Sequence, residues 1–367
     1  MTQQTEKQDT PIAVEQDGTV IAREDLPRLA ENVPGGTGIS PFHMPWAAWW
    51  LILKRIYVMI GFHNLSLLAA GVAFYAFLAF VPLIASVVLL YGLIGDPATV
   101  AGSIDLLSGV APPEVLTILQ DQLLSIVTSS KTAQGFGLAV ALFFSLFGAM
   151  RAATAMMAAL NVIYEEYETR NIIRTTGVAA AITLGMVSVA VVGVAAISFF
   201  TYVRNFLSPY LGETAVFLVQ VATWLVAGAL VSFTFAIFFR YAPDRRAAKW
   251  RWLSMGSALS TLLWLLITVG FGFYVANVSN YNATYGSLAA VVIFLMWLFL
   301  SAYAVLLGAA VNAETERQTM VDSTVGPDMP IGTRGATMAD TIALNETSRA
   351  LLEKKRRYKA NRRAERV

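Results

Sequence analysis

The sequence has no cysteine, only two histidines and few charged residues. The missing cysteines exclude disulfides, thiolate nucleophiles and cysteine-bound metals. His43 and His63 alone cannot build a multi-histidine metal site. Charged residues make up 14% of the 367 residues, whereas about 25% is usual in soluble domains. A water-soluble surface cannot be built from this composition, and the sequence predicts neither a metal nor another cofactor.

What the sequence has in excess is apolar residues, which account for 56% of the chain. About 20 of them in a row suffice to cross a bilayer. The uncharged run over residues 252–313 would make a helix of about 93 Å, so it must hold two spans. We therefore predict an all-α, polytopic membrane protein with six transmembrane helices. The expected spans are at about 66–94, 135–157, 176–203, 214–239, 252–276 and 285–312.

Three segments fall outside these spans. Residues 1–45 are polar and acidic, which predicts a disordered N-terminal tail ahead of a membrane domain over residues 46–315. Residues 97–131 carry leucines at helical spacing among acidic residues, which predicts an amphipathic helical cap outside the bilayer. Residues 316–367 form a basic C-terminal tail, with 9 basic and 2 acidic residues from Arg349 to Val367.

The basic residues also predict the orientation. They precede the first span and gather in the loops between spans 2 and 3 and between spans 4 and 5, whereas the opposite side holds only Lys131 and Arg204. Because cytoplasmic loops are enriched in Lys and Arg, both termini are expected in the cytoplasm and the cap on the far side.

Several residues inside or beside the spans are candidates for function. Arg151 is a cation within an apolar run, so it either binds a substrate or snorkels to the interface. Glu165, Glu166 or a lipid phosphate are its expected partners. Asn282 and Tyr285 belong to a polar patch that could bind a head group or simply form a turn. Pro82 could act as a hinge or make a fixed kink in the first span.

Two further patterns concern lipids and helix packing. The loop between spans 4 and 5 could contact anionic lipid head groups, although positive-inside topology already accounts for its charge. Its five cations are Arg240, Arg245, Arg246, Lys249 and Arg251. On the third span, Gly177, Ala181, Gly185 and Gly193 share one face, which predicts close helix packing or a subunit interface. A nucleic-acid partner is not expected, because few aromatics accompany the basic tail.

Four blocks in order resemble the YihY/virulence factor BrkB family of bacterial inner-membrane proteins, over roughly residues 45–315. The blocks are Leu67–Pro82, Ala152–Tyr164 with Ala159-Leu160-Asn161, Arg240-Tyr241-Ala242-Pro243, and Tyr285–Ala290 leading to Leu306–Ala309. The resemblance implies six helices with both ends inside the cell. It also adds Asn161 to the candidate substrate-binding residues. The family pattern carries a glutamate after Gly308-Ala309, where this chain has Ala310, and Glu314 lies one turn further on the same helical face.

The resemblance implies no established activity. Members were once labelled ribonuclease BN, and one branch is linked to export of lipid A precursors. Our first hypothesis is an inner-membrane protein that translocates, or helps to export, a lipid or amphiphilic anion. The alternative is a non-transporting membrane scaffold for envelope-assembly proteins. Membrane lipids are the expected partners, and either a second copy of the chain or envelope-assembly proteins could be a further partner. A ribonuclease is disfavoured, because the sequence holds no catalytic constellation facing the cytoplasm, and we do not expect an enzyme.

Overall fold

The computed structural model describes residues 13–14, 20–21, 25–94, 131–207, 213–277 and 285–364. Within these ranges, six helices are long and apolar enough to cross a membrane, so the predicted all-α fold with six spans is confirmed. Each of these helices contains a long apolar stretch that suits lipid better than water. A helix can lie in lipid because its backbone N–H and C=O groups bond to one another. These helices are α3 (Leu65–Ile94), α6 (Lys131–Ile163), α7 (Ile172–Leu207), α8 (Glu213–Tyr241), α9 (Trp250–Asn277) and α11 (Ala289–Gln318).

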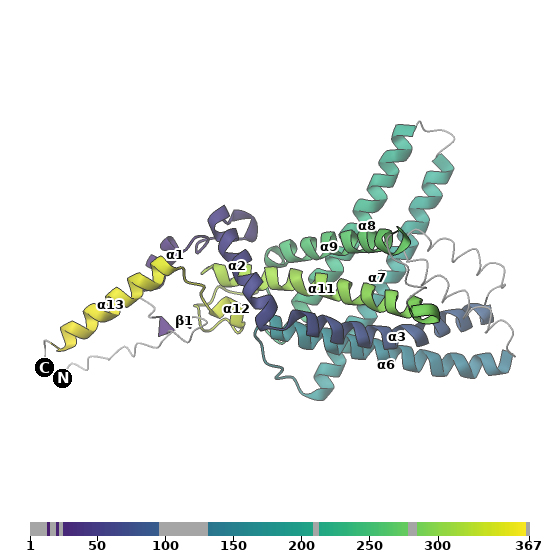
Figure 1. Ribbon diagram of the computed structural model, residues 1–367, viewed down its shortest axis with the longest axis horizontal. Coiled ribbons are helices and arrows are strands. Elements are labelled where there is room, and N and C mark those ends of the chain that lie inside the picture. The colour runs from purple at the N-terminus through teal and green to yellow at the C-terminus, as the bar shows by residue number, and fades with distance from the viewer. Residues whose placement is uncertain are drawn as a thin grey trace.

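The six helices form a ring in chain order. α3 packs on α6, α6 on α7, α7 on α8, α8 on α9 and α9 on α11, and α11 returns to α3 and closes the ring. In Figure 1, α3, α6, α9 and α11 follow the long axis of the molecule, whereas the α7–α8 pair leans away from it. The ring therefore has a parallel part and a divergent pair.

Small residues set how closely the helices approach. Gly148 of α6 lies so near α3 that an added Cβ would be 2.7 Å from the Cα of Ala79. Gly256 of α9 and Gly308 of α11 face each other, and a Cβ on either would collide with the other's carbonyl oxygen. By contrast, Gly185 of α7 meets nothing within 4 Å of the Cβ position, and the same holds for Gly177 and Gly193. Gly177 and Gly185 are exposed, and Gly193 lines a cavity that α7 shares with α8, so among the described residues none of these three glycines makes a close helix contact.

A second layer of structure covers one end of the ring. α2 (Trp46–Phe62) precedes α3 and packs on α11, and Pro41–His43 form a 3₁₀ turn (η2) before it. Residues 25–45, which composition predicts to be disordered, are structured: α1 (Leu26–Asn32) buries Leu29, and the following turns bond to the end of α11. The Nε2 of Gln318 donates to the carbonyl of Pro34 at 2.6 Å. Hydrogen bonds to tertiary partners thus order a segment whose composition alone predicts disorder.

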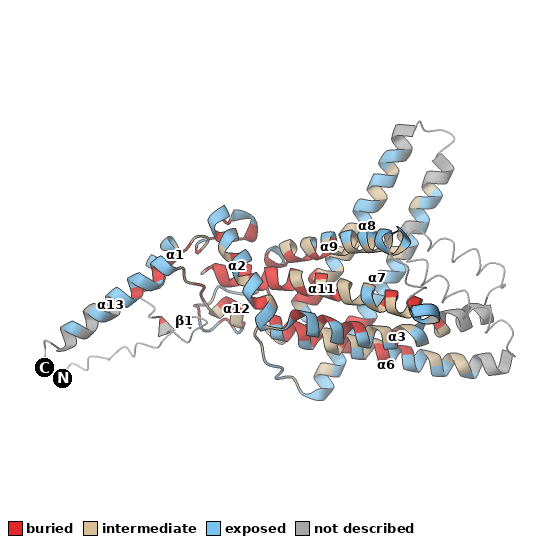
Figure 2. Ribbon diagram, viewed as in Figure 1, coloured by how far each residue is buried: buried red, intermediate tan, exposed pale blue. Residues whose placement is uncertain are grey.

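The C-terminal segment covers the same end. After α11 it contacts the α8–α9 loop through a bridge between Ala248 and Thr324, then forms α12 (Thr337–Asp340) and α13 (Glu346–Ala364). Arg334, only 4% exposed, donates to four carbonyls of this segment, including Met320 at 2.7 Å. Figure 2 shows buried residues gathered at this end of the bundle, next to α2 and α12. We call it the covered end.

The remaining described elements are short. Two-residue strands, β1 (Ala13–Val14) and β2 (Val20–Ile21), pair antiparallel, and a 3₁₀ turn (η3, Gly286–Leu288) precedes α11. The predicted cap at 97–131 lies outside the described residues apart from Lys131, which begins α6. Pro82 lies inside the continuous helix α3, and its role as a hinge stays a prediction.

Candidate functional site

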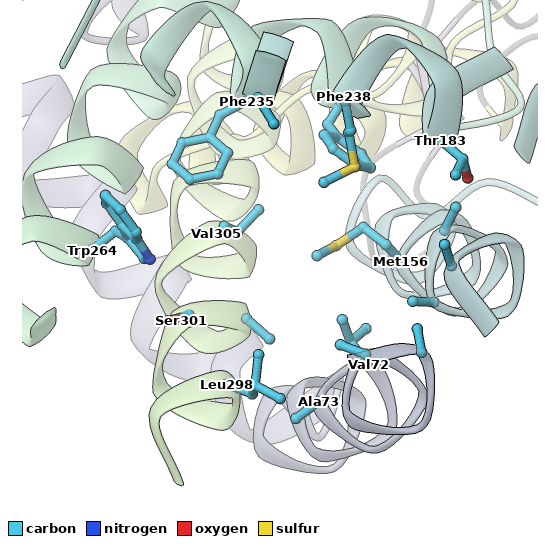
Figure 3. Close-up of a pocket in the computed structure, with 18 of the residues that line it drawn as sticks. Val72, Ala73, Met156, Thr183, Phe235, Phe238, Trp264, Leu298, Ser301 and Val305 are labelled. Atoms are coloured by element: carbon cyan, nitrogen blue, oxygen red, sulfur yellow. The ribbon is translucent and has the colours of Figure 1, made fainter. Parts of the chain in front are cut away.

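The ring encloses a cavity of about 440 Å³, which we call the central cavity. All six membrane helices contribute to its wall, and Figure 3 shows the labelled side chains pointing into one shared space. The lining is almost entirely apolar, with Thr183, Ser301 and Trp264 as its polar members. The Ser301 Oγ is buried and has no hydrogen-bond partner among the described residues. The cavity therefore offers a hydrocarbon-like interior with very few polar groups.

Alanines create this space. Ala73, Ala76 and Ala79 recur every three residues on α3, and Ala149, Ala152 and Ala153 face them from α6. Residues three to four apart share one face of a helix, so each helix presents a strip without bulky side chains. Larger residues such as Phe235 and Phe238 of α8 close the opposite wall. The volume is within the range of about 300–1,000 Å³ that is typical of ligand sites.

A second cavity, of about 530 Å³, lies where the start of α7 passes α6. We call it the α6–α7 cavity. Arg151 lines it together with apolar side chains and threonines, and the Arg151 guanidinium stands 5.0 Å from the centre of the Phe147 ring. The expected partners of Arg151 are engaged elsewhere. Glu165 pairs with Arg317 at 2.6 Å, and Glu166 accepts from the backbone N–H of Thr337 at 2.7 Å.

Asn161 does not face either cavity. Its side chain is buried, donating from Nδ2 to Glu168 at 2.9 Å and accepting at Oδ1 from the backbone N–H of Asp244 at 2.8 Å. Arg170 joins the same cluster, 2.6 Å from Glu168 and 3.6 Å from Asp244. Asn161 therefore ties the end of α6 to the α6–α7 and α8–α9 loops, and it acts as a positioning residue for Glu168.

Ion pairing shifts the acid–base behaviour of this cluster. Hydrogen bonds and charge from Arg170 lower the pKa of Glu168, and the Glu168 carboxylate raises the pKa of Arg170. Burial works against ionisation of Asp244, yet hydrogen bonds from Thr169 and the charge of Arg170 bring its pKa below the usual value. Both carboxylates are therefore held in their charged form.

The five cations around the α8–α9 loop separate into different environments. Arg245 is not available to lipid, because its side chain is 2% exposed, pairs with Glu316 at 2.6 Å and stacks on Tyr164. Burial acts against the charge of Arg245, but Glu316 raises its pKa. Arg240 bonds to the carbonyl of Ala248 and stacks on Trp250. The lipid-contact prediction is therefore wrong for Arg245.

The other three cations differ in their exposure. Lys249 pairs with Asp328 at 2.9 Å, and Arg246 bonds to the Met329 sulfur. Arg251 is exposed at the start of α9, so it can reach a head group. Of the outer polar patch, Tyr285 is 46% exposed, and Asn282 lies outside the described residues.

A buried ionic network at the covered end is not predicted by the sequence. Arg55 of α2 bonds to Glu314 of α11 at 2.6 Å, and Arg317 bridges Glu314 at 3.2 Å and Glu165 at 2.6 Å. Glu314, one turn beyond Ala310, is thus buried in ion pairs. His63 stands 3.9 Å from Glu165, and burial lowers its pKa despite that carboxylate. The polar end of α11 was the available signal in the sequence, since five ionisable or amide residues follow an apolar run there. They are Asn312, Glu314, Glu316, Arg317 and Gln318.

The fold and cavities define a multi-pass membrane protein with an apolar centre, and comparison with known proteins specifies its family. Residues 56–330 match the sequence profile of the family described as virulence factor BrkB, so the chain belongs to that family. The resemblance noted from the four sequence blocks is confirmed. No solved structure matches the chain.

Three curated relatives illustrate the range of similarity. The ribonuclease-like protein YfkH of Bacillus subtilis is 23% identical over 264 residues, 71% of this chain and 94% of that protein. A UPF0761 membrane protein of Paraburkholderia xenovorans is 30% identical over 176 residues, 47% of this chain and 39% of that protein. Another, of Rhodospirillum centenum, is 27% identical over 332 residues, 87% of this chain and 65% of that protein. This chain therefore covers less than two thirds of both UPF0761 relatives.

Proposed function

We propose that this protein moves an amphiphilic anion, such as a phospholipid or a lipid-linked precursor, through the membrane for the cell envelope. The observation that carries the proposal is the central cavity, which all six spans line with apolar side chains. Such a wall suits a hydrocarbon chain, because burying apolar surface is favourable at about 25 cal/mol per Å². Transport of a small polar solute would need more polar groups along the wall than Thr183, Ser301 and Trp264 supply.

The proposed setting is the bacterial inner membrane, with both termini in the cytoplasm. α1, α2, α12 and α13 all lie at the covered end, and so do the loops that carry most of the basic residues (Figure 1). The positive-inside rule favours the cytoplasm for this end. Anionic lipids would also attract the exposed cations there, among them Lys54 and Arg251.

We propose a transport role rather than an enzymatic one, with no nucleic-acid partner. Acid–base or nucleophilic catalysis requires polar groups that converge on a cavity. Here Glu314, Glu316 and Arg317 are 0–2% exposed, and none of them lines the central cavity. Glu314 pairs with Arg317, and Glu316 pairs with Arg245, both at the covered end. Their geometry supports a structural role.

Filling the central cavity tests the proposal. We expect Ala152→Phe to block passage, because its side chain would project into the space between α6 and the other helices. The measurement is flipping of fluorescently labelled phosphatidylglycerol in proteoliposomes, followed by chemical quenching of the outer leaflet. Ala158→Phe is the matched control, since Ala158 lies on the same helix and is exposed. Equal flux in wild type and Ala152→Phe would remove the central cavity from the mechanism.

A scaffold role has one observation in its favour, which is that α13 projects beyond the covered end (Figure 1). Deletion of residues 346–367 separates the two functions, because it removes α13 but keeps Arg334 and the Met320 carbonyl to which it bonds. A transporter should keep its lipid flux after this deletion. Unchanged flux in the reconstituted protein, together with loss of function in cells, would favour the scaffold.

A further inference from the structure

The α6–α7 cavity holds a guanidinium whose charge nothing nearby neutralises. No carboxylate among the described residues forms an ion pair with Arg151, whose side chain is exposed and rests on the ring of Phe147. Arg151 is also the one charged residue between residue 132 and residue 164. A cation inside a membrane span is costly unless it finds a partner or water. The arrangement therefore calls for an anion from outside the chain.

Glu168 also lines this cavity, but its carboxylate is already fully engaged. Its Oε1 accepts from the Nε of Arg170 at 2.6 Å, and its Oε2 accepts from the Nη2 of Arg170 at 2.7 Å and from Asn161 at 2.9 Å. The Arg170 side chain is only 6% exposed and also contacts Asp244. Arg170 and Glu168 thus neutralise each other, and among the described residues that line the cavity only Arg151 carries a charge without an ion-pair partner.

The surroundings of Arg151 combine polar and strongly apolar surface. Thr154, Thr175 and Thr176 lie on the polar side of the cavity. Phe147, 49% exposed, belongs to the same wall, and Phe143, 65% exposed, stacks with it one turn away. A ligand that fits both parts carries an anionic group for the guanidinium and a hydrocarbon part for the two phenylalanines.

α6 separates this cavity from the central one. Met150, Arg151 and Thr154 face the α6–α7 cavity, whereas Ala149, Ala152, Ala153 and Met156 of the same helix face the central cavity. α7 is shared in the same way, with its first turns on one cavity and the stretch from Thr183 to Ala190 on the other. An anionic amphiphile bound at Arg151 would therefore lie on one face of α6, with the apolar central cavity on the opposite face of the same helix.

We propose that the α6–α7 cavity is a binding site for the phosphate group of an anionic amphiphile, with Arg151 as its recognition residue. A guanidinium binds two phosphate oxygens at once through its planar fork. The hydrocarbon chains lie against Phe143 and Phe147. This inference rests on the proposed function, because it names Arg151 as the residue that first binds the phosphate of the transported lipid.

Native mass spectrometry of the purified full-length protein tests the site. Dioleoyl phosphatidylglycerol is offered against dioleoyl phosphatidylcholine, which has the same chains and a phosphate neutralised by choline. We expect wild type to retain phosphatidylglycerol in preference, and Arg151→Ala to lose about tenfold or more of that retention. Arg151→Lys should fall between them, because lysine keeps the charge and loses the fork. Arg28→Ala, at an exposed arginine of α1 at the covered end, is the matched control and should behave as wild type.

Three outcomes would overturn the inference. One is equal retention of phosphatidylglycerol by wild type and Arg151→Ala, which would make Arg151 a snorkelling residue. Another is an equal loss in Arg28→Ala, which would reduce the effect to general surface charge. The third comes from inorganic phosphate alone. If it protects wild type against heat as strongly as phosphatidylglycerol does, and fails to protect Arg151→Ala, the ligand is free phosphate and not a lipid.

The site and the proposed function can fail separately. Loss of phosphatidylglycerol in Arg151→Ala, with unchanged flux in Ala152→Phe, would keep the site and reject passage through the central cavity. Blocked flux in Ala152→Phe, with unchanged lipid retention in Arg151→Ala, would keep the transport function and reject the phosphate site.

Discussion

The α9–α11 pair and the α7–α8 pair both contain glycines, but these glycines lie in close helix contact only in the α9–α11 pair. Gly256 and Gly308 bring α9 and α11 so close that neither position has room for a Cβ, and Asn312 accepts a hydrogen bond from the backbone of Gly256 at 2.8 Å. Glycines 177, 185, 193 and 228 of α7 and α8 have nothing within 4 Å of the Cβ position. A glycine in a membrane helix therefore indicates close packing only when its partner helix also presents a small residue at the same level.

The two pairs are joined at the covered end, where side chains from the loops of α7 and α8 reach α11. Arg245 follows α8 and pairs with Glu316, and Asp244 holds the α6–α7 loop through Thr169 and Arg170. The divergent pair is thus anchored at one end and leans away along the rest of its length (Figure 1). This arrangement concentrates the buried ion pairs of the described residues at the covered end.

Breaking the anchor should have the largest effect. Arg245→Met leaves the buried Glu316 without its counter-ion, and removing one partner of a buried pair typically costs about 3–5 kcal/mol. We expect a strongly lowered melting temperature in detergent. The double variant Arg245→Met/Glu316→Leu should recover most of the loss, because it leaves no unpaired charge. A single variant as stable as wild type would show that the pair does not hold α8 to α11.

Adding a side chain at the tight contact comes next. Gly308→Val would drive a Cβ into the carbonyl of Gly256 and the hydroxyl of Ser260, and overpacking of this kind typically costs about 1–3 kcal/mol. Gly185→Val is the matched control on α7 and should change stability by about 0.5 kcal/mol or less. Thermal unfolding of both variants in the same detergent provides the measurement. Equal destabilisation would mean that α7 is packed as closely as α11, which would contradict the comparison.

Acid should weaken the anchor by a smaller amount. The pKa of Asp244 and that of Glu168 are lower in the folded protein than in the unfolded chain, so both groups stabilise the fold above the unfolded values of about 4. That contribution is lost as the pH falls through the folded values. We expect Asp244→Asn to be less stable than wild type at pH 7 and to lose less stability between pH 5 and pH 3. Parallel pH profiles for the two proteins would exclude Asp244 as a source of acid sensitivity.

Prediction from the sequence succeeded where a local pattern was sufficient. The six spans follow from uncharged runs, because a bilayer admits only segments that bond their own backbone. It failed where a residue's role depends on distant partners. Arg245 looks like its exposed neighbour Arg251 in the sequence, yet only Arg245 meets a buried glutamate, 71 residues further along the chain. Residues 25–45 are likewise ordered by contacts with Gln318 and Thr319, which no local composition reveals.

The sequence by itself determined that this chain is a six-helix membrane protein of the BrkB family and that Arg151 lies within an apolar span. Hydrophobic length and the distribution of charge along the chain are local properties, so they can be read without a fold. Only the tertiary structure decided that the helices close into a ring around an apolar cavity and that Glu165 and Glu166 are unavailable to Arg151. It also decided that Gly177, Gly185 and Gly193 of α7 make no close contact with the described residues of another helix. Those facts depend on which side chains from distant segments come within a few ångströms of one another. Only the packing of the folded chain determines these contacts.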